Sequence, residues 1–429
     1  MNIEIKEKNE YTREMVVTVP WEELEASFNR SVVQFSRSIT LPGYRKGKVP
    51  RKVLFKMFGP EIEAEFIQQA IKDYYVEALE KEAITPVNQA NIKDLSFKQG
   101  EPLEFTAEFE VEPKVNLPDY EKKFKIRKNV YLPDDEDVDI YIQELRQQHA
   151  VLRTVEDGSQ EGHLLLVDIQ ELDSSGVPVI GRKVEDRYIK VGEGIFGGEN
   201  LNKLTNLKVG DVITIEVETQ SGKNFVKYQL TIKNVQEEVL PELDEEFIKK
   251  VDSSAQNESE FRQNVLKKIQ TKLNYDAEMQ FNQAISDYFI QNADLAVPPS
   301  MVDHYLERMV EDAKSRNGES FDERRFREEY KSAAIRDIKW YLIRKALIDK
   351  IGLEVTDEEI TEKVNEIVQG YGEESEQIRR YYRKPSNREN LREDLLDRKL
   401  MDYLKEFVKI EEVKIHTKDI RKRQDSTLL

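Results

Sequence analysis

The 429-residue chain contains no cysteine, and it has only four histidines. Without cysteine there can be no disulfide, no thiolate metal site and no thiol nucleophile. The histidines lie far apart, without the spacing of a metal site, and there is no Gly-x-Ser-x-Gly nucleophile elbow. We therefore expect neither a metal nor a cofactor, and conventional catalysis finds little support.

Long apolar runs are missing as well. No run approaches the roughly twenty residues that span a bilayer, and the start, residues 1–8, alternates charged and apolar side chains. We expect a cytoplasmic protein that does not enter a membrane. Charged residues make up 35% of the chain, against about a quarter in a typical domain. Together with a length that suits about three domains, this predicts an elongated molecule with much exposed surface.

Acidic side chains dominate, since the formal net charge is -18, yet residues 41–60 carry six basic side chains and no acidic one. Within this segment Gly43 and Gly47 free the backbone for tight turns, and Pro42 and Pro50 stiffen both ends. The side chains between them should project as one compact cationic and aromatic group, which suits an anionic partner. We call this group the basic tip; it consists of Tyr44, Arg45, Lys46 and Lys48.

An ordinary solvated turn is the alternative interpretation of a single charge cluster. The glycine and proline spacing argues against it. From Gly43 to Pro50 the chain resembles the ribosome-docking signature of trigger factor, a family of bacterial chaperones, whose pattern is Gly-Phe-Arg-x-Gly-x-x-Pro, with Tyr44 in place of Phe. The resemblance continues in order along the chain at residues 108–113, 117–120, 240–244 and 352–359.

The resemblance implies a chaperone that works without ATP, docks on the large ribosomal subunit near the tunnel exit and holds unfolded nascent polypeptides. The docking contact would be to a ribosomal protein, and a contact to neighbouring ribosomal RNA is left open, as is dimerisation of free molecules. The residues implied in docking are Gly43, Tyr44, Arg45, Lys46, Gly47, Lys48 and Pro50.

Apolar periodicity predicts an α+β domain over residues 1–116. Alternation in residues 3–5 and 11–19, and again in 103–111, is typical of half-buried strands. Helical spacing begins at Trp21 and returns between Ile62 and Tyr74. The basic tip is therefore expected in the loop of a helix–loop–helix.

Three further regions complete the predicted multidomain α+β fold. Residues 117–150 are expected to form a connecting arm that contains a helix from Val138 onward. Residues 151–240 have the short strands and glycine turns of a small β-rich domain, and residues 241–429 have helical patterning almost without interruption. We therefore expect the C-terminal domain to be all-helical.

The segment 151–240 is similar to the FKBP-type prolyl isomerase domain that interrupts trigger factors. Few of the family's pocket aromatics are kept, so we expect weak or absent activity, and the core of a small barrel kept as a spacer is an equal alternative. A glycine pattern at residues 192–197 superficially matches a dinucleotide loop, but it leaves no room for the long helix that such a loop requires. By position, the implied pocket residues are Ile169, Val179, Ile195, Phe196, Leu201 and Tyr228.

Apolar stripes on the C-terminal helices are, by default, core residues. Some of these helices are apolar over more than one face, for example at residues 340–343. The resemblance implies that they form a substrate cradle together with the arm. Two alternatives remain open: an isomerase whose helical arms deliver substrate, and a helical scaffold that binds no client. The candidate substrate contacts are Met301, Tyr305, Met309, Trp340, Tyr371 and Tyr381.

Overall fold

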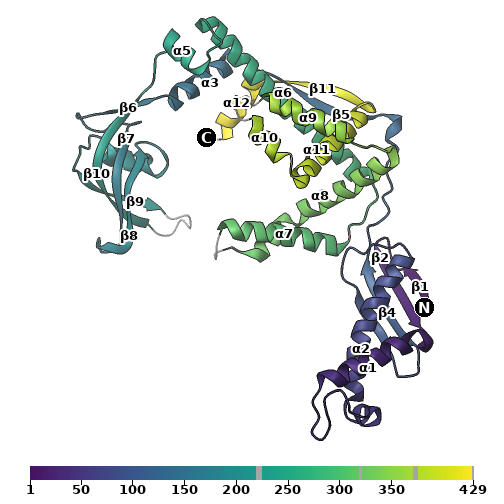
Figure 1. The fold of residues 1–429 in the computed structure, drawn as a ribbon. Coiled ribbons are helices and arrows are strands. Elements are labelled where there is room, and N and C mark those ends of the chain that lie inside the picture. Colours follow the sequence, from purple (N-terminus) through teal and green to yellow (C-terminus); the bar gives the residue numbers. More distant parts are fainter. Residues whose placement is uncertain (219–224, 318–320, 371–374, 428–429) are drawn as a thin grey trace. The chain divides into compact units, whose positions relative to one another are not determined.

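A computed structural model of the chain describes residues 1–218, 225–317, 321–370 and 375–427 (Figure 1). The chain divides into two compact units. The first consists of residues 1–127 and 280–411, and the second of residues 128–279 and 412–429. In the described part, no helix is both long enough and apolar enough to cross a membrane.

An antiparallel sheet of four strands opens the first unit, in the order β1-β2-β4-β3. The predicted alternation is confirmed, because Met15, Val17 and Val19 of β2 are all buried on one face. The third strand in sequence was not predicted. The strands are β1 (Asn2–Glu7), β2 (Thr12–Val19), β3 (Asn91–Ser96) and β4 (Leu103–Glu110).

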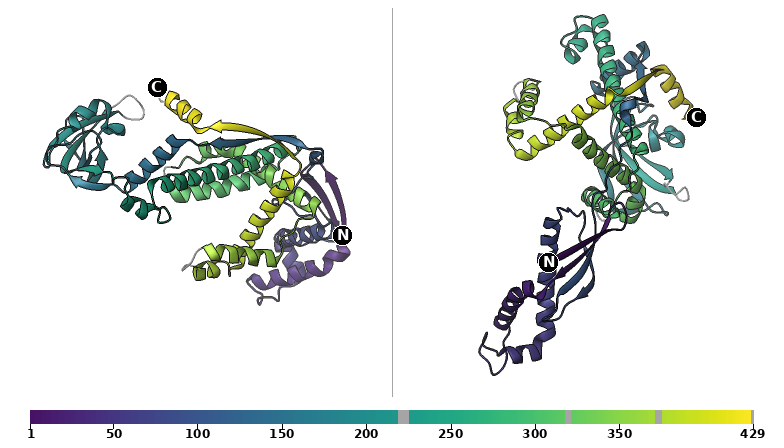
Figure 2. Two further views of the ribbon diagram at one scale, coloured as in Figure 1. Left: turned by 90° about the horizontal axis from the view of Figure 1, so that it is seen from above. Right: turned by 90° about the vertical axis from the view of Figure 1, so that its right-hand side faces the viewer.

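Two helices, α1 (Trp21–Ser38) and α2 (Arg51–Lys81), form the predicted helix–loop–helix and extend beyond the sheet (Figures 1 and 2). Phe28 of α1 packs edge-to-face on Phe66 of α2, with ring centroids 5.1 Å apart. Such an aromatic contact adds to the burial of both rings. The backbone of α2 leaves helical geometry at Phe58, just before a proline that cannot donate a helical hydrogen bond. The loop is thus carried on a packed pair of helices.

Long helices build the rest of the first unit around two core clusters. The larger one includes Phe289, Leu306, Leu342 and Leu400, and the smaller one includes Ile360, Val364 and Leu391. The helical C-terminal region is as expected, and the start of α9 has the hydrogen bonds of a capping box: Glu359 N–H donates to Thr356 Oγ1 at 3.3 Å. The helices are α6 (Glu258–Asn292), of which residues 280–292 belong to this unit and the earlier residues to the second, α7 (Pro299–Asn317), α8 (Glu323–Ile351), α9 (Asp357–Gly370), α10 (Ser375–Tyr381) and α11 (Pro385–Lys405), with a 3-10 turn at Tyr120–Lys122.

One strand interrupts the helices where none was expected. Residues Val408–His416 form β11, which pairs with β5 (Phe124–Leu132) in a two-stranded ribbon. The prediction of an all-helical C-terminal region was therefore wrong at this point, and β5 in the arm was also missed. Strand pairing satisfies the backbone groups of two segments that lie far apart in sequence. Helix α12 (Thr417–Thr427) follows β11.

The second unit contains the predicted β-rich region, with strand order β6-β10-β7-β8 and β9 beside β10. Leu165, Ile215 and Leu230 form part of its buried core. The helix after the glycine-rich turn has only four residues, α4 (Leu201–Leu204), which agrees with the absence of a dinucleotide loop. The other elements are β6 (Val151–Thr154), β7 (Leu164–Leu172), β8 (Pro178–Lys190), β9 (Val212–Glu218), β10 (Phe225–Val239), α3 (Asp135–Gln148) and α5 (Glu245–Val251), with 3-10 turns at Gly194–Phe196 and Gly198–Asn200.

Candidate functional site

The loop between α1 and α2 is fixed by its own backbone. Gly43 and Gly47 have φ angles of 88° and 75°, which L side chains rarely adopt, so both positions require glycine. The Gly47 N–H donates to the Ser36 carbonyl at 3.1 Å, and the Lys48 N–H donates to the Arg45 carbonyl at 2.9 Å. The loop therefore presents its side chains from a defined turn.

Apolar residues at both ends of the loop hold it against the domain. Ile39 and Val49 are half-buried and pack against the core that the sheet forms with α1 and α2. Helix α2 begins directly after Pro50, with no side-chain cap and no acidic residue in its first turn. Its first residue, Arg51, lies 5.3 Å from the ring centroid of Phe55. The positive end of α2 is thus left uncompensated beside the loop.

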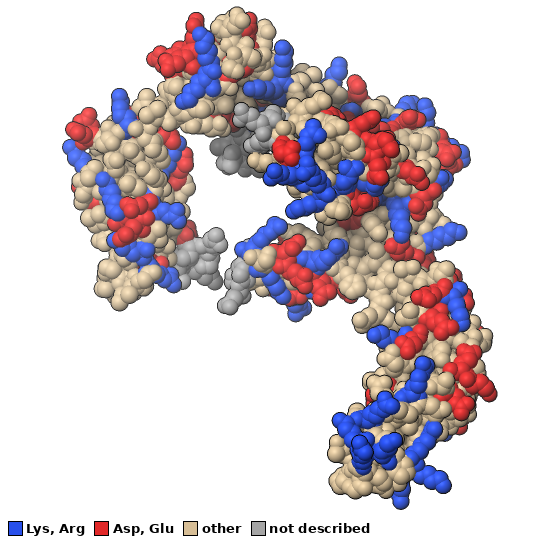
Figure 3. Space-filling view, viewed as in Figure 1, with Lys and Arg blue, Asp and Glu red and all other residues tan. Residues whose placement is uncertain are grey.

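The basic tip is exposed and has no counter-charge. Tyr44 is 41% exposed, and Arg45, Lys46 and Lys48 are all exposed. Within the described ranges, no carboxylate lies within ion-pair distance of these three cations. Figure 3 shows basic side chains gathered at this end of the domain. The basic tip and both glycines lie in the loop between α1 and α2, as the sequence predicts. Its chemistry suits phosphate or carboxylate groups, for which arginine supplies paired donors.

A groove of about 750 Å³ lies along α7 and α8. Met301 and Tyr305 of α7 face Ile338 and Tyr341 of α8, and Tyr341 is 47% exposed. The Tyr305 hydroxyl donates to Asp337 Oδ2 at 2.9 Å. Partial burial, together with this carboxylate, raises the pKa of Tyr305. We call this the helical groove; its remaining lining residues are Val87, Glu112, His304, Glu307, Arg308 and Glu311.

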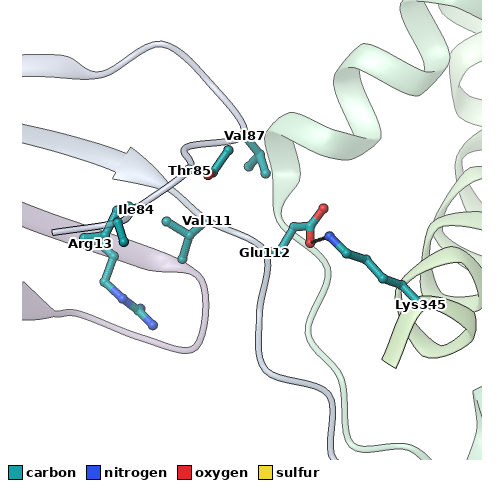
Figure 4. A pocket seen from close by; sticks show the side chains of 8 residues that line it. Arg13, Ile84, Thr85, Val87, Val111, Glu112 and Lys345 are labelled. Carbon is teal, nitrogen blue, oxygen red and sulfur yellow. Dashed lines mark hydrogen bonds and ion pairs between the residues drawn. The ribbon is translucent and has the colours of Figure 1, made fainter. Parts of the chain in front are cut away.

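A second cavity, of about 500 Å³, adjoins the helical groove, since Val87 and Glu112 line both. Lys345 of α8 reaches Glu112 at 2.6 Å, while Arg13 lies on the other side of the cavity (Figure 4). The hydrogen bond to Glu112 raises the pKa of Lys345. Charged groups therefore flank an aliphatic floor that includes Ile84 and Val111, and such a surface can hold an extended peptide through several weak contacts.

The candidate substrate contacts that the structure describes do not form one surface. Met301 and Tyr305 line the helical groove, whereas Met309 and Trp340 are half-buried against the helical core and are absent from its lining. Tyr381 is on α10 and is 54% exposed. The prediction for Tyr371 falls outside the described residues.

Sequence reasoning missed two aromatic features of these helices. Tyr341 was not a candidate although it lines the helical groove. At the start of α8, Phe326 and Tyr330 stack with centroids 4.3 Å apart, and Phe321 lies 5.1 Å from Phe326. The i, i+4 spacing of rings at a helix start could have indicated this cluster.

The implied isomerase residues are mostly packed together. Ile169, Phe196, Leu201 and Tyr228 are half-buried against the β-rich core, and Ile195 is 51% exposed. Val179 lies apart from that cluster, on β8. Residues 219–223 of the predicted short hairpin lie outside the described part.

Comparison with known proteins gave consistent matches. A model described as bacterial trigger factor protein matches residues 1–145, and a model of the C-terminus of that protein matches residues 259–406. The chain is 27% identical to a trigger factor of Marinobacter nauticus over 424 residues, 97% of each chain. It is 29% identical to a trigger factor of Geobacillus sp. over 410 residues, 91% of this chain and 94% of that one.

The fold is also matched by a solved structure described as "Promiscuous Substrate Recognition in Folding and Assembly Activities of the Trigger Factor Chaperone". The match covers 94% of this chain and 99% of the other, with 22% identity and a TM-score of 0.50.

Proposed function

Because the chain belongs to the trigger factor family, we propose that it is an ATP-independent chaperone that docks on the large ribosomal subunit and holds unfolded nascent polypeptides. It would act in the cytoplasm, beside the exit of the nascent chain. Residues 1–116 serve as the docking domain, 117–150 as an arm, 151–240 as an isomerase-type domain and 241–429 as the chaperone domain.

The observation that carries the docking proposal is the basic tip. Its cations have no carboxylate partner among the described residues, although acidic side chains outnumber basic ones in the whole chain by 84 to 66. Unpaired charges on a fixed loop lose little conformational freedom on binding. Arg45 supplies a planar fork of donors, and Tyr44 supplies a ring at low entropic cost. A ribosomal surface, rich in phosphate and acidic groups, is the partner that fits.

The helical groove is the proposed client site. Met301, Tyr305 and Tyr341 offer apolar contact of the adaptable kind that accepts different sequences. Each contact is weak, but tethering to the ribosome raises the local concentration of the emerging chain, so weak contacts suffice.

Isomerase activity is the alternative function, and the geometry favours it less. Catalysis of X-Pro rotation requires an apolar pocket that desolvates and twists the amide. Four of the six implied residues pack against the core of the β-rich domain, Ile195 is exposed, and Val179 lies apart from them on β8. We therefore propose that this domain has weak or no isomerase activity.

Co-sedimentation with purified ribosomes tests the docking proposal. The parent is compared with a variant that combines Tyr44→Ala, Arg45→Ala and Lys46→Ala. A matched control, Tyr275→Ala with Lys267→Ala and Lys268→Ala, removes one exposed ring and two exposed cations from α6. We expect the tip variant to stay in the supernatant and the control to pellet with the ribosomes. Equal pelleting of parent and tip variant, or no pelleting of the parent, would overturn the proposal.

A further inference from the structure

A second acid-free basic segment lies far from the basic tip in sequence. Residues 377–388 contain five basic side chains and no acidic one. They cover the end of α10 and the start of α11, and Figure 3 shows basic side chains over this part of the molecule. We call it the second basic surface; its cations are Arg379, Arg380, Arg383, Lys384 and Arg388.

Among the residues that the structure describes, one carboxylate forms ion pairs with cations of this surface. Glu376 is shared between Arg380, at 3.8 Å, and Arg383, at 3.3 Å. No carboxylate in the described residues lies within ion-pair distance of Arg379 or Lys384. Both cations are exposed. The surface therefore keeps a clear excess of positive charge in a strongly acidic chain.

The N-terminus of α11 adds to this positive potential. The helix begins at Pro385 with no side-chain cap and no acidic residue in its first turn. Free N–H groups at a helix start attract anions. Helix α7 also lacks an acidic first turn, but there Glu110 accepts a hydrogen bond from the Ser300 N–H at 3.0 Å. Helices α2 and α11 thus share an uncompensated basic start.

An exposed ring completes the arrangement. Tyr381 is 54% exposed and stands edge-on to Tyr382, with centroids 5.1 Å apart. The contact restrains the ring of Tyr381 among the arginines. The guanidinium group of an arginine can donate two parallel hydrogen bonds to one phosphate, and an exposed ring can stack on an unpaired base.

We propose that the second basic surface binds the phosphate backbone of RNA, with Tyr381 stacking on an unpaired base. The identification of that RNA as ribosomal rests on the proposed function, whereas binding of a short RNA does not. An acidic peptide would also meet the cations. It would leave the ring of Tyr381 without a stacking partner, and for that reason we favour RNA.

Fluorescence anisotropy with a labelled single-stranded RNA of about twenty nucleotides tests the inference. The full chain is used with Arg45→Ala, Lys46→Ala and Lys48→Ala throughout, so that the basic tip does not contribute. In this background a second variant adds Arg379→Ala, Arg380→Ala, Arg383→Ala and Lys384→Ala. Each phosphate contact contributes about 0.7 to the slope of log K against log salt on single strands. We expect the slope to fall by about 3 and the affinity at low salt to fall at least about tenfold.

Two controls make the result specific. Lys249→Ala, Lys250→Ala, Lys267→Ala and Lys268→Ala remove the same charge from exposed positions on α5 and α6, and they should leave both slope and affinity unchanged. Tyr381→Ala should weaken RNA binding about fivefold or more, while Tyr381→Phe should retain it. Circular dichroism and thermal melting verify that each variant is folded.

The inference is overturned if the chain with Arg45, Lys46 and Lys48 replaced by alanine does not bind the RNA. It is also overturned if the variant with the four further substitutions binds the RNA as tightly as that chain. It is also overturned if a decaglutamate peptide competes as tightly as the RNA and Tyr381→Ala has no effect, which would indicate an acidic-peptide site. Failure of the docking proposal can be distinguished from failure of this inference, because the parent would then not pellet with ribosomes although it still bound the RNA.

Discussion

The basic tip and the β-rich domain both expose cations, but only those of the β-rich domain include cations in ion pairs with described carboxylates. In the β-rich domain Lys233 lies 2.7 Å from Asp168 and 2.8 Å from Asp186, and Lys190 lies 3.0 Å from Glu238. In the tip no described carboxylate approaches Arg45 or Lys46. Paired surface charges are already satisfied and contribute little to binding, whereas unpaired ones keep their full attraction for a partner.

The same contrast separates what the two regions keep of the family. The tip keeps every backbone-determining residue of the docking pattern from Gly43 to Pro50. The β-rich domain keeps a sheet and a packed core, while its implied pocket residues serve largely as packing. One fold can host different functions, so local side-chain chemistry is the better guide to function.

Reversing one charge in each region should give the largest difference in ribosome affinity between the two regions. Arg45→Glu should lower ribosome affinity by about a hundredfold or more, because it removes a central anchor and adds repulsion. Lys183→Glu makes the same change of net charge beside Asp168 and should leave the affinity unchanged. Equilibrium binding to purified ribosomes measures both. Equal losses would mean that overall charge, and not the tip, governs docking.

The helical groove should show the next largest effect. Met301→Ala combined with Tyr341→Ala removes apolar contact from both walls of the groove, and we expect client affinity to fall about tenfold. Suppression of light scattering by an unfolded client reports this loss. Met279→Ala with Tyr275→Ala, at exposed positions of α6 outside the groove lining, should leave holding intact, and ribosome pelleting should be normal in both variants. Unchanged holding by the groove variant would contradict the assignment.

Isomerase turnover should be low and insensitive to mutation. In a protease-coupled assay of proline isomerisation, the full chain should accelerate the reaction little above the uncatalysed rate. Tyr228→Ala should change that rate little, because the ring packs against the core of the β-rich domain. Strong turnover that Tyr228→Ala abolishes would show that a functional pocket forms and would reverse our comparison of the two regions.

The smallest effect concerns paired charge in the domain that carries the tip. Hydrogen bonds from Lys8 and then Lys93 lower the pKa of Glu108 to about 2. Since the folded-state pKa is lower than the unfolded one, the stabilisation is present above about pH 4.5 and is lost as the pH falls toward 2. Glu108→Gln should therefore reduce the loss of stability between these pH values. Urea unfolding at about pH 7, 4 and 3 measures it; a parallel loss in both proteins would contradict the prediction.

Local chemistry explains what the sequence could predict. The tip depends on glycines, prolines and cations that are adjacent in the chain, so its turn and exposure follow from a few residues. The flanking helices and the capping box at Thr356 were predictable for the same reason. Nothing local indicates the pairing of β5 with β11, because each strand is completed by a segment that lies far away in the sequence.

The groove could be predicted only in part. Apolar spacing identified Met301 and Tyr305, but the same spacing is typical of core residues such as Trp340. Whether a ring faces a groove or a core depends on how α7 packs against α8. Likewise sequence alone does not show that Arg379 has no ion-pair partner among the described residues, since Glu376 is only three residues away and pairs with other arginines.

Photo-crosslinking from a single position tests the central claim most directly. A photoreactive phenylalanine derivative replaces Tyr44 in one protein and Tyr188, an exposed residue of β8, in another. After irradiation with ribosomes, position 44 should crosslink to a component of the large subunit, and position 188 should give only background. Background crosslinking from position 44 while the protein remains bound to ribosomes would contradict the account.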